Sequence, residues 1–560
     1  MKRRTGSVSF VVALALTSTL IIWPVTASSQ KASAGQSYKD SPTARSRSQE
    51  DTAASQTPIP PSHTIKVEAP VKRTLAEMEQ ADLAESPLPF EEEDRNMITM
   101  DPEEYAEAKA VAEAERRAAR PFVPEAGVVP LAPPTIIGPN FEGNAQLSAF
   151  PPDTHGAVGT KQYVEVTNQN VSIYNKTTGV RTNGCSGSVC KGVSLSSFFG
   201  YTTQGLFDPR VVHDRLWKRW VVTADAFAES STKQLFFFAI SSTEDATSPY
   251  FIYAINVTLT AGDFWDYPQV GLDQDAVIFT ANIFSSTGAY KGADMFTVAK
   301  ALLYNGFGFS VPVFTALKGT LAATNVLDQN PSTFLIAATP NNNVVYMYTL
   351  TNSSRPPGEI LTGPVSIPVT SYTVPPNAPQ PAACAGTSNA NKLDTLDNRF
   401  QNASTQNGTF IYNVHSINLV GFSSPRYYKI NTSTKTVAES GMLFASSTSH
   451  DFNPSIEANF EGDMAVTWSD TDPTNKINAQ VRLSGKRFND AGTINHTGLV
   501  VFTSTTCLTG NFDSHKGLQR WGDYSAVSFD LDTNQLQFYI VNEKINTISL
   551  WGSRIARGSF

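Results

Sequence analysis

A short polar landmark recurs seven times after residue 150, each time at the head of a stretch rich in β-branched and aromatic residues. Each landmark places an acidic or Asn residue beside Pro, Arg or Tyr: Pro151-Pro152-Asp153, Asp208-Pro209-Arg210, Asp266-Tyr267-Pro268, Asp328-Gln329-Asn330-Pro331, Asp397-Asn398-Arg399, Asp451-Phe452-Asn453-Pro454 and Gly522-Asp523-Tyr524. Consecutive landmark acids lie 55, 58, 62, 69, 54 and 72 residues apart. Each interval can hold four short strands with their loops, which is the length of one blade of a β-propeller.

The sequence between the landmarks predicts strands and almost no helix. Short apolar runs such as residues 235–240 alternate with clusters of Gly, Asn, Asp, Ser and Thr. Strands at regular spacing without intervening helices are typical of a sandwich, barrel or propeller, and residues 136–560 exceed what one sandwich or barrel needs. We therefore predict an all-β fold, a single β-propeller of seven blades over residues 136–560. Six or eight blades are the alternatives. A transmembrane barrel is disfavoured because residues 235–240 are apolar throughout.

The first 135 residues differ in composition from the rest. Residues 1–27 combine a basic start, an apolar run and a small-residue cleavage site, as secretory signal peptides do. Residues 28–135 are rich in Ser, Ala, Pro, Glu and Lys and poor in aromatics, which predicts a disordered spacer. Within the spacer, capping and charge signals predict a helix near residues 101–119, either solvated or partner-binding. We expect a secreted, periplasmic or cell-surface protein without a membrane span after signal cleavage.

Charge and cysteine content limit the partners and the scaffold. The formal net charge is −8, and a nucleic-acid-binding protein would show a clustered basic face instead. We therefore expect no nucleic-acid partner, and we expect a monomer. Four cysteines are too few for a disulfide-built scaffold. Cys185 and Cys190 could close a small loop, which would leave Cys384 and Cys507 as the second pair, but the sequence leaves the connectivity open.

The landmark residues are the candidate functional residues. The first strand of each propeller blade lines the central channel, so residues at the start of each blade should converge at one end of it, which we call the funnel. The candidates for ligand binding are Asp153, Asp266, Tyr267, Asp397 and Asn453. The candidates for catalysis are Asp208, Arg210, Arg399, Arg520, Asp523, Tyr524 and Glu543. The alternative is that each short polar side chain binds the backbone of its own turn.

Several strings in this region resemble one protein family. They are residues 151–154, 208–214, 266–268, 393–399, 462–465, 520–525 and 551–555. Together they resemble secreted bacterial sialidase-like propeller proteins, a family of undefined function, over roughly residues 136–560.

The resemblance implies a possible hydrolytic site. Cleavage of a sialoside uses three arginines to hold a carboxylate, an Asp as acid, and a Tyr activated by a Glu. Arg210, Arg399 and Arg520 supply the arginines, Tyr524 the nucleophile and Glu543 its activator. The Asp-box turn of sialidases is not clean anywhere in the chain, and residues 528–532 are the nearest match.

Metal sites have little support in the sequence. Asp530, Asp532 and Asn534 alternate oxygen ligands as calcium loops do, but no Gly at the sixth position and no Glu at the twelfth follow. A β-turn is the preferred interpretation. The seven histidines occur singly, and none has metal-ligand spacing to another. We expect no cofactor, with calcium as the alternative.

The functional prediction is a secreted propeller that recognises a glycan, or an envelope or extracellular protein, through its funnel. One alternative is a glycoside hydrolase or lyase of sialidase-like type that uses the Asp, Arg and Tyr residues of the funnel. The other is a structural scaffold, for which an apolar, carboxylate-poor funnel is expected.

Overall fold

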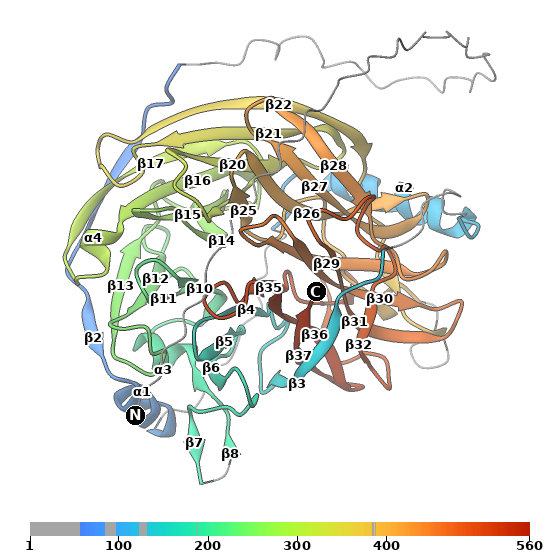
Figure 1. Ribbon diagram of the computed structural model, residues 1–560, viewed down its shortest axis with the longest axis horizontal. Helices are drawn as coiled ribbons and strands as arrows, with labels where there is room; N and C mark the ends of the chain where they lie inside the picture. Colours follow the sequence, from blue (N-terminus) through green and yellow to red (C-terminus); the bar gives the residue numbers. More distant parts are fainter. Residues whose placement is uncertain (1–56, 85–96, 123–130, 188, 383–385, 387) are drawn as a thin grey trace, which may run out of the picture. The chain divides into compact units, whose positions relative to one another are not determined.

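The computed structural model describes residues 57–84, 97–122, 131–187, 189–382, 386 and 388–560 (Figure 1). All of them belong to one unit, Asp51–Phe560. The signal peptide predicted for residues 1–27 lies outside the described residues. No helix in the described part of the chain is long and apolar enough to span a membrane.

Seven antiparallel sheets, here numbered I to VII, account for most of the described strands. Sheet I contains β4 (His155–Val158), β5 (Gln162–Val166), β6 (Asn170–Asn175) and β9 (Val193–Ser194). Sheet II contains β10 (Leu206–Asp214), β11 (Arg219–Ala226), β12 (Leu235–Ser241) and β13 (Tyr250–Asn256). Sheet III contains β14 (Phe264–Leu272), β15 (Ala276–Phe284), β16 (Tyr290–Ala299) and β17 (Phe309–Leu317). Sheet IV contains β18 (Thr320–Ala322), β20 (Ser332–Ala338), β21 (Asn342–Thr351) and β22 (Ile360–Tyr372).

The remaining sheets follow the same order along the chain, except that the last also recruits an early strand. Sheet V contains β25 (Ser404–Asn407), β26 (Phe410–Leu419), β27 (Phe422–Asn431) and β28 (Thr436–Met442). Sheet VI contains β29 (His450–Ala458), β30 (Met464–Asp472), β31 (Ile477–Lys486) and β32 (Leu499–Thr503). Sheet VII contains β35 (Ala526–Phe529), β36 (Gln537–Thr547), β37 (Leu550–Ser559) and the early strand β3 (Thr135–Ala145).

Shorter elements extend or connect these sheets. The short strands are β1 (His63–Val67), β2 (Val71–Arg73), β7 (Cys185–Ser186), β8 (Val189–Cys190), β19 (Thr324–Val326), β23 (Ala378–Pro379), β24 (Lys392–Leu393), β33 (Phe512–Asp513) and β34 (Leu518–Gln519). The helices are α1 (Leu75–Ala84), α2 (Pro102–Ala118), α3 (Leu195–Phe199), α4 (Lys300–Leu303) and the 3-10 helix η1 (Asn389–Asn391).

The first strands of the sheets form a closed cycle. Contacts run from β4 to β10, β14, β19, β25, β29 and β35, and from β35 back to β4. The segment at the start of sheet IV contributes to two sheets. Strand β18 pairs with β20 of sheet IV, whereas β19, which follows it, pairs in parallel with β25 of sheet V. Sheets arranged around a central axis in this way, as Figure 1 shows, are the defining feature of a propeller.

The core lies between neighbouring sheets. Phe236, Phe279 and Phe296 pack edge to face or tilted against one another, with ring centroids 5.2 to 6.5 Å apart, and so join sheets II and III. Every residue of β15 is buried, and so is every residue of β12 after Leu235. Strands packed on both faces are apolar throughout, and this explains why residues 235–240 show no alternation.

Strand β3 closes the ring by pairing antiparallel with β37. The register places Phe141 opposite Ile555 and Asn140 opposite Ala556. This seam joins the start and the end of the propeller region, so neither β3 nor β37 presents an open edge to the other side of the ring.

The disordered spacer predicted for residues 28–135 is wrong for the described residues 57–84 and 97–122. Strand β1 pairs with β17 at the edge of sheet III, and β2 pairs with β13 at the edge of sheet II. Met78 of α1 is fully buried in the core that sheets I and II share. A composition argument misses such segments because a strand added to an existing edge takes its hydrogen bonds from that edge and needs little apolar surface of its own.

Helix α2 covers the residues for which a helix was predicted. The Asp101 carboxylate accepts hydrogen bonds from the amides of Glu103 and Glu104, as an N-cap should. The helix is not the solvated spacer that we expected, because Ala112 is buried and Lys109 contacts the propeller through four hydrogen bonds.

Cys185 and Cys190 form a disulfide that closes the β7–β8 hairpin. Cys507 is also disulfide-bonded, and Cys384 lies outside the described residues.

Candidate functional site

The landmarks create the same backbone turn in several first strands. Asp153, Asp208, Tyr267 and Asn453 have φ angles of 45°, 49°, 58° and 51°, in the left-handed region. In β10, β14 and β29 the pairing register shifts at this residue, so each turn is a β-bulge. Asp and Asn tolerate this conformation, whereas Tyr267 is strained by about 1–2 kcal/mol. A bulge repeated at the same place in successive strands brings the neighbouring side chains together at one end of the axis.

Most of the predicted landmarks lie where a funnel requires them. Asp208 and Asp266 lie on first strands, and Asp397 and Asp523 lie shortly before β25 and β35. The prediction that Asp328 lies at the start of a blade is wrong. Asp328 follows the first strand of sheet IV and lies in the loop between β19 and β20. Here the same letters mark an ordinary turn, in which the Asp328 carboxylate accepts from the Asn330 amide at 3.2 Å.

Two of the three predicted arginines are paired with an acid of their own landmark. Arg399 donates from Nε and one terminal nitrogen to Asp397, both at 2.9 Å, and both side chains are buried. Arg520 lies 3.3 Å from the Asp523 carboxylate. Bidentate pairing of this kind orients the guanidinium and neutralises its charge.

Arg210 is held differently. It donates to the carbonyl oxygens of Pro268 and Gln401 and to the side chain of Asn402. Its guanidinium lies 3.3 Å from the centre of the Tyr524 ring, a cation–π contact.

The landmark side chains from several sheets meet around Tyr267. The guanidinium groups of Arg210 and Arg399 lie 5.4 and 4.7 Å from the centre of its ring. Its hydroxyl donates to the carbonyl oxygen of Asp523 at 3.1 Å. Residues of sheets II and III and of the segments before sheets V and VII thus converge, as the repeat predicts.

Buried carboxyl groups complete the funnel. The Asp153 carboxyl accepts hydrogen bonds from the amide of Asp523 at 2.6 Å and from the Asn168 side chain at 2.7 Å. Burial, and then the negative charge of Asp523, raises the pKa of Asp153 to about 6. Burial also raises the pKa of Asp266 to about 7 and that of Asp208 well above its usual range. Burial is the largest cause of all three shifts, and it favours the protonated form of each carboxyl group.

Three buried amides at or near the landmarks each have an acceptor oxygen without a hydrogen-bond partner among the described residues. The amide nitrogens of Gln269 and Gln401 donate to the carbonyl oxygens of Phe400 and Asp523, at 3.0 and 2.6 Å. That of Asn453 lies 3.5 Å from the carbonyl oxygen of Tyr524. These bonds fix the orientation of each amide. The side-chain oxygens of all three are buried and have no hydrogen-bond partner among the described residues, which is unusual for buried acceptors.

The segment before and within α2 covers the funnel. The Thr99 hydroxyl donates to Asp397 at 2.7 Å, and Arg399 donates to the carbonyl oxygen of Met97. The Lys109 ammonium donates to the carbonyl oxygen of Leu396 at 2.7 Å, and burial lowers its pKa to about 8. Sequence reasoning missed this cover, because neither Thr99 nor Lys109 belongs to a recognisable motif.

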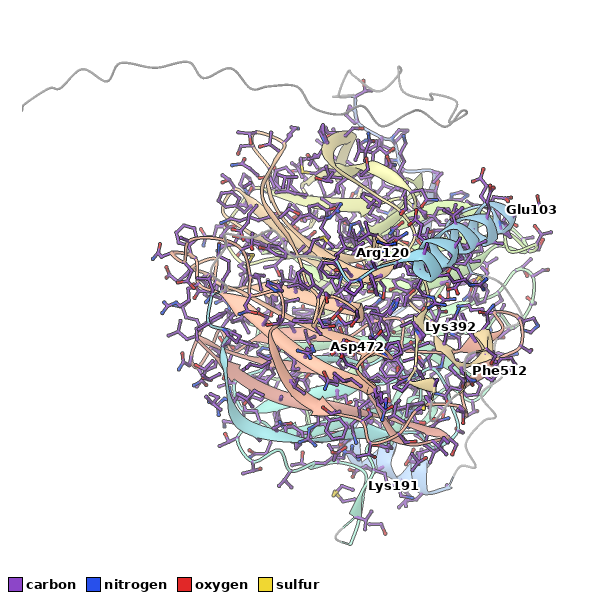
Figure 2. The ribbon with its side chains drawn as sticks, turned by 90° about the vertical axis from the view of Figure 1, so that its right-hand side faces the viewer. Glu103, Arg120, Lys191, Lys392, Asp472 and Phe512 are labelled. Atoms are coloured by element: carbon purple, nitrogen blue, oxygen red, sulfur yellow. A yellow bond between two sulfur atoms is a disulfide. The ribbon has the colours of Figure 1, made fainter. Side chains whose placement is uncertain are left out.

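A groove of about 580 Å³ lies between α2 and the loops beside β24 and β34. Its lining includes Tyr105, Lys109, Glu113, Asp394 and Lys516. Figure 2 shows α2 above Lys392, whose ammonium is ion-paired with Glu113 at 2.8 Å. A second cavity, of about 110 Å³, lies along the axis and is lined by His155, His213, Asn402, Glu457 and other first-strand residues.

The nucleophile expected by analogy with sialidases is not assembled. The Tyr524 hydroxyl donates to the carbonyl oxygen of Pro209 at 3.2 Å, whereas the Glu543 carboxyl accepts from the Gly522 amide at 2.6 Å. Burial raises the pKa of both groups well above their usual ranges. The two side chains bind different backbone groups and not each other, so Glu543 does not activate the Tyr524 hydroxyl.

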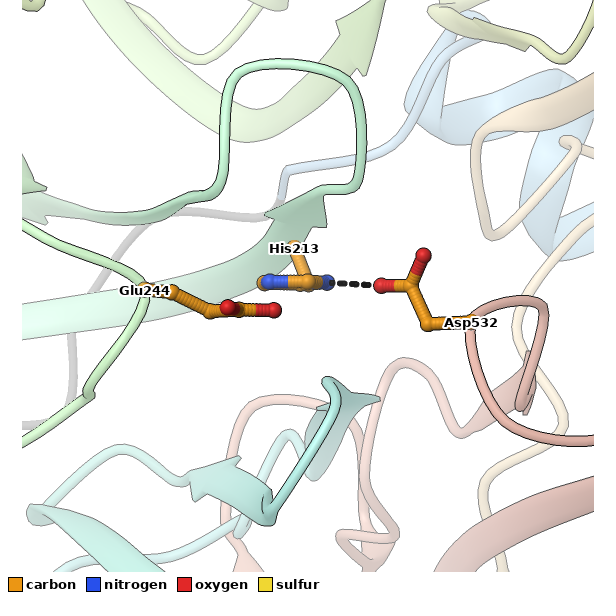
Figure 3. A group of neighbouring side chains, drawn as sticks. All are labelled: His213, Glu244 and Asp532. Carbon is orange, nitrogen blue, oxygen red and sulfur yellow. Dashed lines mark ion pairs between the residues drawn. The ribbon is translucent and has the colours of Figure 1, made fainter.

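The three calcium candidates do not gather around a common point. Asp530 is a buried partner of the Lys176 ammonium at 2.8 Å, and Asn534 accepts from the amide of Leu536 within its own turn. Asp532 instead lies beside His213 and Glu244, and Figure 3 shows these three side chains together. The turn interpretation therefore describes this loop better than a calcium loop does.

No protein-family model matches the chain, and no curated protein matches it. A solved structure with similarity is a Trypanosoma rangeli sialidase in complex with sialic acid, at 11% identity and a TM-score of 0.32, over 62% of this chain and 53% of that chain. A Cellvibrio cellulosa α-L-arabinanase mutant matches at 7% identity and a TM-score of 0.30, over 63% and 95%. A Bacteroides thetaiotaomicron endo-arabinase matches at 9% and 0.27, over 63% and 93%. The chain spans about half the length of the sialidase, and similarity at this level carries no conclusion about activity.

Proposed function

We propose that this protein is a secreted, seven-bladed β-propeller that binds a glycan at the funnel. The observation that carries the proposal is the set of three buried amide oxygens, on Gln269, Gln401 and Asn453, that have no partner among the described residues. A sugar presents several hydroxyl groups close together, and each can donate to such an acceptor. Buried acceptors that stay unpaired cost about 1–3 kcal/mol each, so a ligand that supplies donors gains affinity there.

Binding fits the funnel better than glycosidic cleavage does. A glycosidase needs two carboxyl groups about 5–5.5 Å apart for retention, or about 6.5–9.5 Å for inversion, so that the bond lies between them. For the sialidase-like alternative, the Tyr524 hydroxyl and the Glu543 carboxyl bind separate backbone groups and not each other. The scaffold alternative is also disfavoured, because it requires an apolar funnel and this one is rich in carboxyl groups.

The cover must move before a ligand reaches the amides. Thr99 and Lys109 together make five hydrogen bonds to the propeller. The groove beside α2 has a volume within the range of about 300–1,000 Å³ that small-ligand sites show. We infer that the ligand enters along this groove and that the segment carrying Thr99 and Lys109 shifts as it binds.

The test is binding of labelled neutral and acidic oligosaccharides to the full chain and to a Thr99→Val/Lys109→Met variant. We expect the variant to bind one class more tightly than the unaltered protein, because the cover is loosened. Adding Gln401→Leu or Gln269→Leu should weaken that binding at least tenfold, whereas Gln329→Leu on an exposed loop should leave it unchanged. Absence of binding to every oligosaccharide by both proteins would overturn the proposal.

A further inference from the structure

A second cluster of polar side chains lies away from the funnel. His213 is near the end of β10, five residues after Asp208. At about 3.3 Å per residue, this places it well toward the opposite end of the channel. Glu244 comes from the loop between β12 and β13, and Asp532 from the turn between β35 and β36. One ligand atom from each of the three lies within 4.8 Å of the other two. In the view of Figure 3, the His213 ring lies between the two carboxyl groups.

His213 has a buried nitrogen without a partner. Its side chain is only 5% exposed, and Nε2 has no hydrogen-bond partner among the described residues. The Trp220 ring packs against the imidazole at a centroid distance of 4.6 Å and fixes its orientation. Burial lowers the pKa of His213 to about 4, although Asp532 opposes this shift. The other ring nitrogen, Nδ1, lies 3.9 Å from the Asp532 carboxylate.

The carboxylates already have one cationic partner. The Lys218 ammonium lies 3.1 Å from Asp532 and 3.4 Å from Glu244. Its side chain is 43% exposed, so it is free to swing toward solvent. The Thr160 hydroxyl donates to Glu244 and lies near Asp532. A divalent ion would therefore have to displace only a flexible lysine from a preformed pair of acids.

We propose that His213, Glu244 and Asp532 form a binding site for a divalent transition-metal ion such as Zn²⁺. One imidazole with two carboxylates is a ligand set typical of Zn²⁺ and its neighbours, whereas Ca²⁺ and Mg²⁺ prefer oxygen alone. Bonds of about 2.0–2.2 Å require the ligand atoms to draw together by about 1 Å. Glu244 and Asp532 are both on loops and can make that movement. The bound ion would link sheets II and VII.

The experiment uses the untagged full chain, stripped with a chelator, and titrates Zn²⁺ by calorimetry while thermal unfolding is followed in parallel. We expect one Zn²⁺ per chain and a higher unfolding temperature, with no comparable response to Ca²⁺ or Mg²⁺. His213→Ala and Asp532→Asn should each weaken binding at least tenfold. Lys218→Met should strengthen it at least threefold, because the competing ammonium is gone.

His515→Ala is the matched control, since His515 lies 3.8 Å from the Asp513 carboxylate and is not part of the His213 cluster, and it should leave Zn²⁺ binding unchanged. The Co²⁺ derivative gives an independent readout, and its visible absorption should change with Asp532→Asn. Two outcomes would overturn the proposal: no Zn²⁺ binding by either the unaltered protein or Lys218→Met, or binding that Asp532→Asn leaves unchanged. The Asp532 variant keeps the test valid if His213→Ala fails to fold, because it leaves the packing of Trp220 intact.

Discussion

Replacing Arg399 by Ala should destabilise the protein strongly, since its guanidinium is the main partner of a buried carboxylate. The Arg399 and Asp397 side chains are 4% and 1% exposed. Without Arg399, Asp397 keeps the Thr99 hydroxyl and one backbone amide as partners. Removal of one member of a buried ion pair costs about 3–5 kcal/mol, and we expect a loss of this size at pH 7.

The loss of stability caused by Arg399→Ala should depend on pH, because the Asp397 carboxyl titrates. Burial raises its pKa, but the charge and hydrogen bonds of Arg399 outweigh this and hold it at about 2, below the unfolded value of about 3.9. The pair therefore stabilises the fold above pH 4, and this contribution disappears as the pH falls toward 2. A difference of about 1.9 pKa units corresponds to about 2.6 kcal/mol. About 0.8 kcal/mol of this contribution remains at pH 2.5, so the gap in stability between the variant and the unaltered protein should shrink by about 1.8 kcal/mol between pH 7 and pH 2.5.

The assay is urea unfolding followed by tryptophan fluorescence at pH 7 and at pH 2.5. Arg117→Ala is the control, because that side chain is 69% exposed and its ion pair should contribute less than about 1 kcal/mol. A cycle with Asp397→Asn measures the coupling of the two side chains directly. If Arg399→Ala cost no more than Arg117→Ala, or if its cost were the same at both pH values, the structural role argued for Arg399 would be refuted.

Three other predictions concern the channel, the calcium candidates and closure. Burial raises the pKa of Glu457 to about 8, so the stability of the unaltered protein should fall from about pH 4 to pH 8. Glu457→Gln should therefore raise the unfolding temperature at pH 9 but not at pH 5, and an equal shift at both would contradict this. Because Asp530 is paired with Lys176, Ca²⁺ should leave the unfolding temperature unchanged, and a rise of several degrees would argue against this assignment. Deletion of residues 546–560 removes β37 and should abolish soluble expression. A truncated protein that stayed monomeric and unfolded cooperatively would contradict this prediction.

The sequence predicts the repeat because the bulge has a local chemical requirement. A left-handed residue ahead of Pro restricts the choice of side chain, so Asp208 and Asn453 can be recognised without the fold. Asp328 shows the limit of this rule, since the same residue types also suit an ordinary turn. The bidentate pairing of Arg399 with Asp397, both buried, was found in the structure and not from the sequence.

The cover and the His213 cluster could not be predicted, because both depend on contacts distant in the chain. Thr99 meets Asp397 across 298 residues, and neither residue carries a signal of the other. His213 lies on strand β10, whereas Glu244 and Asp532 lie on loops of sheets II and VII, and only the closed ring brings sheets II and VII together. Metal-ligand spacing is a pattern of residues close together in the sequence. A site whose ligands come from different sheets therefore produces no such pattern.

The pairing of β3 with β37 has a consequence for how the chain acquires its fold during synthesis. Residues bonded across this seam are as much as 424 positions apart. A ribosome that has released sheets I to VI still holds a chain in which β3 lacks its partner β37. The apolar faces of sheets I and VI that pack on sheet VII are uncovered too, a surface that invites association with other chains. Any interruption of translation before residue 550 would leave that surface exposed. We therefore expect chains that lack β37 to aggregate.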